Sequence, residues 1–148
     1  MVLTRYEKAI ELHHKGFNCC QSVLAAFGDK TGLDEQTALN IAGGFGAGAG
    51  TGELCGALTG AVMTLGLTHP VDTADPVGSK RRTVGLGKGV QNAFAGIFGD
   101  LRCAPLLKKN IAPESSPAAQ AMGLTQRCDI IIVNAIEQVE AVLSQEEG

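Results

Sequence analysis

Five cysteines are the residues of this chain best suited to do chemistry: Cys19, Cys20, Cys55, Cys103 and Cys128. A thiolate attacks disulfides, peroxides and electrophiles, and it is also the form of cysteine that binds metal ions. At 148 residues the chain is long enough to bury a sizeable core without disulfide support. We therefore expect these thiols to serve catalysis, redox sensing or metal binding.

Four of the cysteines fall in the first turn of a predicted helix. Cys19 directly follows Asn18, a preferred capping residue. The other three each lie three residues after a helix-start signal: Cys55 after Gly52, Cys103 after Asp100 and Cys128 after Thr125. Because helix N-termini present unpaired N–H groups and a partial positive charge, we expect this placement to lower the pKa of each thiol below about 8.5. Cys20 lies about 100° around the helix from Cys19 and is read as a packing residue.

The spacing of these cysteines requires the fold to build any site they share. Cys19, Cys55, Cys103 and Cys128 are 36, 48 and 25 residues apart, and no CxxC motif is present. A thioredoxin-type dithiol and a zinc ribbon are therefore not indicated. His13 and His14 close the first predicted helix shortly before Cys19. They could lie near Cys19, but we read them as exposed helix-end residues that the helix dipole favours. No histidine-rich motif with a supporting carboxylate is evident, which speaks against hydrolytic metal chemistry.

A glycine-dense segment, residues 43–52, precedes an uncharged apolar run from Leu54 to Leu67. Within that run Gly56, Gly60 and Thr64 recur every four residues, a small-residue stripe that lets a second helix or a cofactor approach the backbone. The run to Thr68 has 15 residues, fewer than the roughly 20 needed to span a membrane, so we expect a buried central helix.

The glycines near Cys55 predict a cradle of backbone amides rather than a nucleotide site. Gly44, Gly46 and Gly56 are expected to place amides around the Cys55 sulfur, or around a cofactor bound there. A dinucleotide fingerprint would need a preceding strand and a βαβ unit, and a P-loop would need a GK[ST] sequence. The sequence contains neither pattern.

The remaining elements are predicted to be helical, with a Pro/Ser/Ala-rich loop at residues 110–123. Ile130-Ile131-Ile132-Val133 has strand propensity, but the surrounding periodicity favours a helix. Further helices are expected at about residues 4–15, 18–27, 34–41, 76–98, 101–108 and 126–145. We therefore expect an all-α single domain over residues 1–148, a bundle of about six or seven helices around the central glycine-rich helix.

Charge and composition narrow the classes of partner. The net charge is -3, and the chain has one tyrosine, five phenylalanines and no tryptophan. Nucleic-acid binding is therefore not expected. Arg5, Glu7 and Lys8 stand where a signal peptide would carry its apolar segment, so a cytoplasmic location is expected.

The sequence around the cysteines resembles the redox-active family labelled C_GCAxxG_C_C, over about residues 5–143. The resemblance rests on these stretches: Gly-Phe-Asn-Cys-Cys-Gln-Ser-Val around Cys19, Gly44-Phe45-Gly46, Cys55-Gly56-Ala57-Leu58-Thr59-Gly60, Arg102-Cys103 and Cys128. The Gly-Cys-Ala order of the label reads Cys-Gly-Ala here. The resemblance implies a bacterial or archaeal, mainly helical protein whose four functional cysteines are Cys19, Cys55, Cys103 and Cys128, with Cys20 as an extra.

The family is also similar to part of the split-Soret cytochromes, which carry haem and are thought to hold an iron–sulfur cluster. No CxxCH motif occurs in this chain, so covalent haem is not expected. Four thiolates are the usual ligands of a [2Fe–2S] cluster, which keeps a cluster among the implied cofactors.

Three functions remain open at this point. In the first, a thiol-dependent oxidoreductase, Cys55 attacks, Cys103 or Cys128 resolves, and the redox partner is unknown. In the second, Cys19, Cys55, Cys103 and Cys128 together hold an iron–sulfur cluster or a structural zinc. In the third, the chain is a helical binding module whose cysteines only pack. The small-residue stripe could equally serve a homodimer interface.

Overall fold

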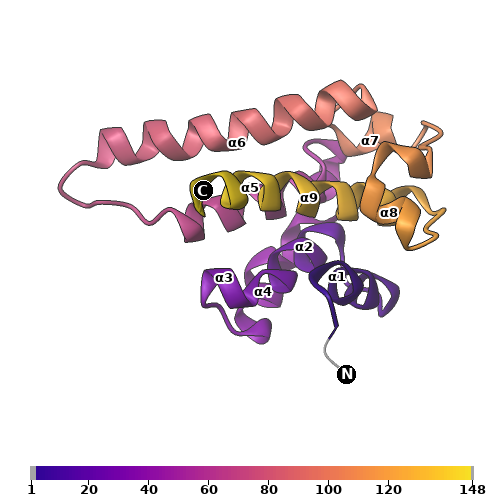
Figure 1. The fold of residues 1–148 in the computed structure, drawn as a ribbon, viewed down its shortest axis with the longest axis horizontal. Helices are drawn as coiled ribbons and strands as arrows, with labels where there is room; N and C mark the ends of the chain where they lie inside the picture. The colour runs from indigo at the N-terminus through magenta and orange to yellow at the C-terminus, as the bar shows by residue number, and fades with distance from the viewer. Residues whose placement is uncertain (1–2, 148) are drawn as a thin grey trace.

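A computed structural model describes residues 3–147 of the protein. Over those residues it contains nine α-helices and no β-strand, which confirms the expected all-α class (Figure 1). The α-helices are α1 (Arg5–His14), α2 (Cys19–Ala26), α3 (Gly28–Thr31), α4 (Glu35–Ala42), α5 (Gly56–Thr68), α6 (Pro76–Phe98), α7 (Cys103–Leu106), α8 (Pro117–Ala121) and α9 (Arg127–Glu147). Short 3₁₀ turns occur at Gly43–Phe45 (η1) and Pro113–Ser115 (η3), and a π-type turn at Gly48–Gly52 (η2).

Local capping fixes where the first two helices begin. The Thr4 side chain accepts from the Glu7 amide, and the Glu7 carboxylate accepts from the Thr4 amide. Asn18 and Gln21 repeat this reciprocal pair at the start of α2, with both hydrogen bonds at 2.8 Å. Each reciprocal pair satisfies two backbone N–H groups that a helix start would otherwise leave unpaired. Both starts agree with the sequence prediction.

Two regions differ from the prediction. The expected loop at residues 110–123 contains the short helix α8, because the Ser116 hydroxyl accepts from the Ala119 amide and caps it. The expected helix at 101–108 is shortened to α7, because the Asp100 carboxylate takes the amides of Leu101 and Arg102. The helix count exceeds six or seven because α3 and α8, which have only four and five residues, were not expected.

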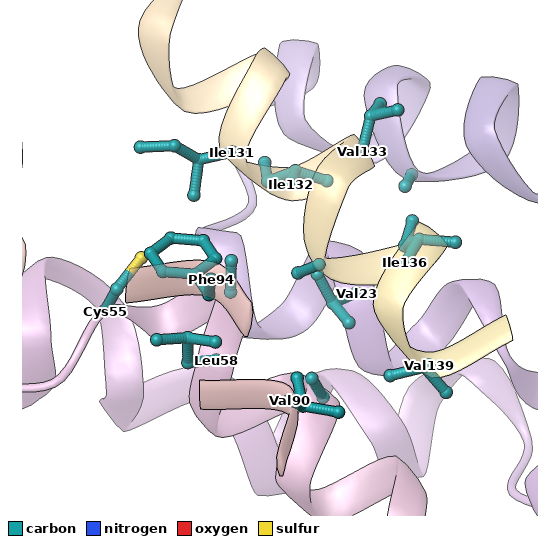
Figure 2. Close-up of a cluster of buried hydrophobic side chains, with 14 of the residues drawn as sticks. Val23, Cys55, Leu58, Val90, Phe94, Ile131, Ile132, Val133, Ile136 and Val139 are labelled. Atoms are coloured by element: carbon teal, nitrogen blue, oxygen red, sulfur yellow. The ribbon is translucent and has the colours of Figure 1, made fainter. Parts of the chain in front are cut away.

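Helix α5 is the centre of the bundle and packs against α2, α6 and α9. Figure 2 shows side chains from these elements meeting in one apolar core. Leu58 of α5, Phe94 of α6 and Ile132 of α9 are all fully buried. Burying a side chain of this size contributes about 1.5–3 kcal/mol. The run Ile130–Val133 is helical, so its β-branched side chains serve this core rather than a strand.

The small-residue stripe of α5 faces α2 within the same chain. A Cβ atom added at Gly60 would lie 2.9 Å from the Cys20 carbonyl oxygen and 3.0 Å from the Val23 Cβ. Thr64 is fully buried, and its hydroxyl donates to the Gly60 carbonyl oxygen. The stripe therefore allows close packing of α2 on α5 in the core.

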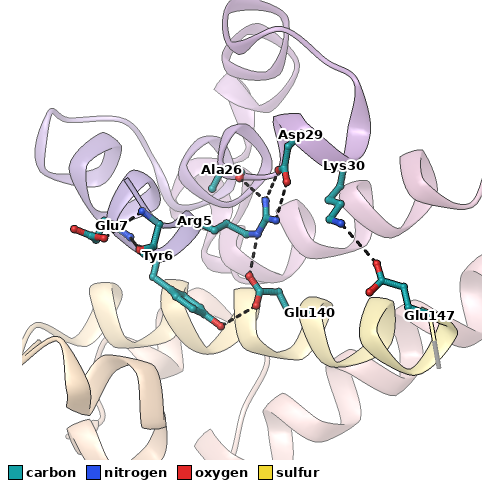
Figure 3. A network of polar contacts seen from close by, with 9 residues as sticks. Arg5, Tyr6, Glu7, Ala26, Asp29, Lys30, Glu140 and Glu147 are labelled. Atoms are coloured by element: carbon teal, nitrogen blue, oxygen red, sulfur yellow. Dashed lines mark hydrogen bonds and ion pairs between the residues drawn. The ribbon is translucent and has the colours of Figure 1, made fainter. Parts of the chain in front are cut away.

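A polar network closes the bundle between its first and last helices (Figure 3). Arg5 pairs with Asp29 and with Glu140, donates to the Ala26 carbonyl oxygen, and lies 4.3 Å above the Phe27 ring. These contacts join α1 to the start of α3 and to α9. In the described part of the chain, none of the helices combines the length and apolar character needed to cross a membrane.

Candidate thiol site

The four predicted site cysteines lie at the N-terminal ends of four different helices. Cys19 is the first residue of α2, Cys103 the first of α7 and Cys128 the second of α9, whereas Cys55 is the N-cap of α5. In each of the six pairs among these cysteines, one thiol raises or lowers the pKa of the other. The fold therefore brings together residues that are separated by 25 to 109 positions along the chain.

A single antiparallel bridge holds Cys55 next to Cys103. The bridge pairs Leu54 with Arg102, the residues directly before the two cysteines. The Cys55 amide donates to the Leu101 carbonyl oxygen at 2.8 Å, and the Cys103 amide donates to the Glu53 carbonyl oxygen at 2.7 Å. Both cysteine amides are thereby used to position the chain, so they are not free to bind an anion.

Gly56 brings Cys55 close to Cys19. A Cβ atom at Gly56 would lie 3.3 Å from the Cys19 Cβ and 3.1 Å from the Cys20 amide nitrogen. Such distances are shorter than normal van der Waals contacts, so glycine is required for α5 to begin against the first turn of α2. Gly56 is the predicted cofactor-binding glycine that directly adjoins the cysteines.

The other glycines of the predicted cradle are placed differently. Gly46 lies against Asn18, with an added Cβ 2.9 Å from the Asn18 Cβ, whereas no described atom comes within 4 Å of a Cβ at Gly44. Further along the segment, a Cβ at Gly52 would lie 2.9 Å from that of Ala104 in α7. The segment therefore reaches the starts of both α2 and α7.

The Cys19 and Cys128 thiols form the most strongly interacting pair. The pKa of Cys128 is lowered to about 6, first because the Cys19 thiol hydrogen-bonds to its sulfur, and further by the nearby charges of His13 and Arg127. The same interaction and burial raise the pKa of Cys19. The interaction therefore favours the thiolate on Cys128 over a thiolate on Cys19.

The remaining two thiols are harder to ionise. Burial raises the pKa of Cys55 to about 11, although attraction to the amides of Ala57 and Leu58 opposes the shift. Burial and the neighbouring Cys128 raise the pKa of Cys103. A lowered thiol pKa was expected at all four helix starts, but of these four cysteines only Cys128 has one. Cys55, expected to be the attacking thiol, is only 5% exposed and has a raised pKa.

Cys20 points away from this group. It is fully buried in a second apolar cluster with Leu12, Leu24 and Ala38, and its sulfur lies 3.9 Å from that of Met63. This agrees with its interpretation as a packing residue.

Sequence reasoning missed the polar group that adjoins Cys128. His13 Nδ1 lies 2.7 Å from one Asp129 carboxylate oxygen, and His14 Nε2 lies 2.8 Å from the other. Asp129 is only 2% exposed, although it is a carboxylate. It lies 116 residues from His13, so no local motif could show the contact. The one available signal was an acidic residue directly after a candidate cysteine.

The thiols are spread more widely than a single metal ion requires. A tetrahedral zinc with Zn–S bonds of about 2.3 Å holds its sulfurs roughly 3.8 Å apart. In the described part of the chain, no three cysteine sulfurs lie within 4.8 Å of one another. As they lie, these sulfurs therefore do not have the spacing of the ligands of one tetrahedral zinc ion.

Comparison with protein-family models matches residues 17–142 to the family described as "putative redox-active protein (C_GCAxxG_C_C)". The matched range contains Cys19, Cys55, Cys103 and Cys128. Comparisons with curated proteins and with solved structures gave no match.

Proposed function

The chain belongs to the redox-active C_GCAxxG_C_C family, and from this premise we propose that it is a thiol–disulfide redox protein in which Cys128 attacks and Cys19 resolves. The observation that carries the proposal is the direct interaction of these two thiols within a group of four. Two thiols in contact can form a disulfide with little movement of the backbone. Cys19 and Cys128 are both partly exposed, and of the two Cys128 has the thiolate character that a nucleophile requires.

The first step is attack by Cys128 on a disulfide in the redox partner. The Cys128 thiolate bonds to one partner sulfur and displaces the other as a thiolate, which leaves a mixed disulfide. The displaced thiolate takes up the proton of the Cys19 thiol, which then becomes a nucleophile.

The second step forms the disulfide between Cys19 and Cys128. The Cys19 thiolate attacks the Cys128 sulfur and releases the second partner sulfur as a thiolate, which is protonated by water. Two electrons pass from the two cysteines to the partner, whose disulfide becomes two thiols. A reductant of the dithiol class returns the protein to its starting state by the reverse exchange.

The test is to treat reduced, metal-free protein with a low-molecular-weight disulfide, cystamine, and map the products by peptide mass spectrometry. We expect a Cys19–Cys128 disulfide in the natural chain and a trapped mixed disulfide on Cys128 in Cys19→Ser. Cys20→Ser is the matched control, since it removes a neighbouring buried thiol that faces Met63, and it should behave as the natural chain does. A mixed disulfide on Cys55 or Cys103 in Cys19→Ser would contradict the assignment.

A four-thiolate iron–sulfur centre is the second candidate. It is favoured because, in all six pairs among the four cysteines, one thiol affects the pKa of the other. A simple dithiol would need only one such pair. Cys19, Cys55, Cys103 and Cys128 would hold the cluster, which would supply one-electron transfer.

Elemental analysis and a visible spectrum of protein purified without air separate the two candidates. Iron and sulfide in equal amounts, lost in Cys103→Ser and retained in Cys20→Ser, would favour the cluster. Colourless, iron-free protein that forms the Cys19–Cys128 disulfide would favour the dithiol.

A further inference from the structure

We propose that His13, His14 and Asp129 form a binding site for a divalent transition-metal ion, separate from the four thiols. Their ligand atoms (His13 Nδ1, His14 Nε2 and a carboxylate oxygen of Asp129) all lie within 4.8 Å of one another. Among the described residues, this is the one set of three histidine, cysteine or acidic ligands that meets this distance. No cysteine sulfur belongs to it.

The geometry needs only a small adjustment to accept an ion. Zinc bonds to imidazole nitrogen and carboxylate oxygen are about 2.0–2.2 Å long, so tetrahedral ligands lie roughly 3.3 Å apart. The two nitrogen–oxygen separations are now 2.7 and 2.8 Å, and the nitrogens lie within 4.8 Å of each other. These two separations end on different oxygens of Asp129, so an ion between the nitrogens would contact both carboxylate oxygens once each pair widens by about half an ångström.

Burial makes the carboxylate a fixed ligand and leaves an open side. The Asp129 side chain is 3% exposed, and both of its oxygens already face a histidine nitrogen. The His14 side chain is 53% exposed, so an ion can enter past it and water can fill a remaining position. Three protein ligands and an open position are the pattern of reactive zinc sites, and two imidazoles with one carboxylate also suit ferrous iron.

The ion would replace two hydrogen bonds. Without metal, each histidine can donate its N–H to Asp129, which satisfies the buried carboxylate. On binding, the N–H proton of each neutral histidine moves to the other ring nitrogen, so that His13 Nδ1 and His14 Nε2 become ligands. The ion would also join the last turn of α1 to the first turn of α9, so it should raise the thermal midpoint.

The test follows the imidazole nitrogens by long-range ¹H–¹⁵N NMR while Zn²⁺ is added to the reduced, full-length protein. The chain has three histidines, and His69 is an internal control, because it pairs with Glu146 without a second histidine. We expect His13 and His14 signals to shift together and saturate at one ion per chain beyond any thiol-bound metal. His69 should not move, and Mg²⁺ should have no effect, since it prefers oxygen ligands.

His14→Gln is the matched variant, because the glutamine amide can still donate to Asp129 but does not bind zinc. We expect it to weaken Zn²⁺ binding by at least about tenfold, the loss seen even for groups that only support a ligand. The site would be refuted if His13 and His14 stayed unshifted at millimolar Zn²⁺, if all three histidines shifted alike, or if His14→Gln bound as tightly as the natural chain. None of these results depends on whether Cys19 and Cys128 form a disulfide.

Discussion

At the scale of single residues, neighbours and burial decide which thiol can react. Cys128 and Cys55 both lie at the start of a long helix, yet the pKa is about 6 for Cys128 and about 11 for Cys55. Cys128 is half-buried and receives a hydrogen bond from Cys19, whereas Cys55 is enclosed by the apolar core that also contains Phe94 (Figure 2). The helix terminus favours a thiolate in both places, but for Cys55 the cost of burying the charge is larger.

This difference predicts the order of alkylation by iodoacetamide in metal-free, reduced protein at pH 7. The thiolate fraction is about 10⁴ times larger for Cys128 than for Cys55, from pKa values of about 6 and 11. The lower nucleophilicity of the more acidic thiol offsets about 10² to 10²·⁵ of that gain. We therefore expect Cys128 to react roughly 30- to 100-fold faster, measured by peptide mass spectrometry over time. Equal rates, or faster labelling of Cys55, would show that the assignment of the reactive thiol is incorrect.

The contact at Gly56 gives a second prediction at this scale. Gly56→Ala should lower the free energy of unfolding by about 1–3 kcal/mol, because the new methyl group would press against the first turn of α2. Gly85→Ala on α6 is the control, since no described atom lies within 4 Å of its added Cβ. It should raise stability by up to about 1 kcal/mol through helix propensity. Urea denaturation measures both, and a neutral Gly56→Ala would contradict the tight contact.

At the scale of elements, the glycine segment (residues 43–52) supports the helices that carry the thiols. Its backbone is left-handed at Ala47 and Ala49, and Gly52 (φ 74°) lies directly against α7. Two residues later, Leu54 forms the bridge with Arg102. The strained segment and the bridge together fix α7 relative to the start of α5.

Substituting two glycines of this segment tests whether it supports α7. Gly50→Ala and Gly52→Ala both place a side chain at positive φ, 79° and 74°, which costs about 1–2 kcal/mol. Only Gly52→Ala also meets the Ala104 methyl group, at 2.9 Å, whereas no described atom lies within 4 Å of a Cβ at Gly50. We expect Gly52→Ala to lose about 1–3 kcal/mol more and to change the alkylation rate of Cys103. If the two variants were equally stable, the segment would not support α7.

The sequence predicts elements well where their ends are set locally. Asn18 with Gln21, and Asp75 with Pro76, mark helix starts that the structure confirms. Residues 101–108 were predicted less well because Asp100 and the bridge to Leu54, a contact across 48 positions, decide where α7 begins. For the same reason the thiols could be identified as candidates but not ranked, since their pKa values depend on burial and on partners from other helices.

At the scale of the whole molecule, the thiols make stability depend on pH in two opposite ways. The folded-state pKa of Cys128 is about 6, below the unfolded value of about 8.5. Its stabilising effect is therefore full above about pH 8.5 and is lost as the pH falls through 6. The pKa values of Cys55 and Tyr6 are raised by burial, so their contribution is full below their unfolded values of about 8.5 and 10 and is lost as the pH rises through their folded values.

These opposite slopes predict that the free energy of unfolding is greatest near pH 8 to 9. Asp29 and Asp100 do not contribute to the pH dependence in this range. Arg5 lowers the pKa of Asp29, and the Arg102 amide lowers that of Asp100, so both carboxyl groups change the free energy of unfolding only below about pH 4. The measurement is the urea midpoint from pH 5 to 10.5 in reducing, chelating buffer. Cys128→Ser should remove the rise between pH 6 and 8.5 and keep the decline above pH 9. If the rise persisted without Cys128, another group would have to bind the proton, and the charge of the Cys19–Cys128 pair would not reside on Cys128.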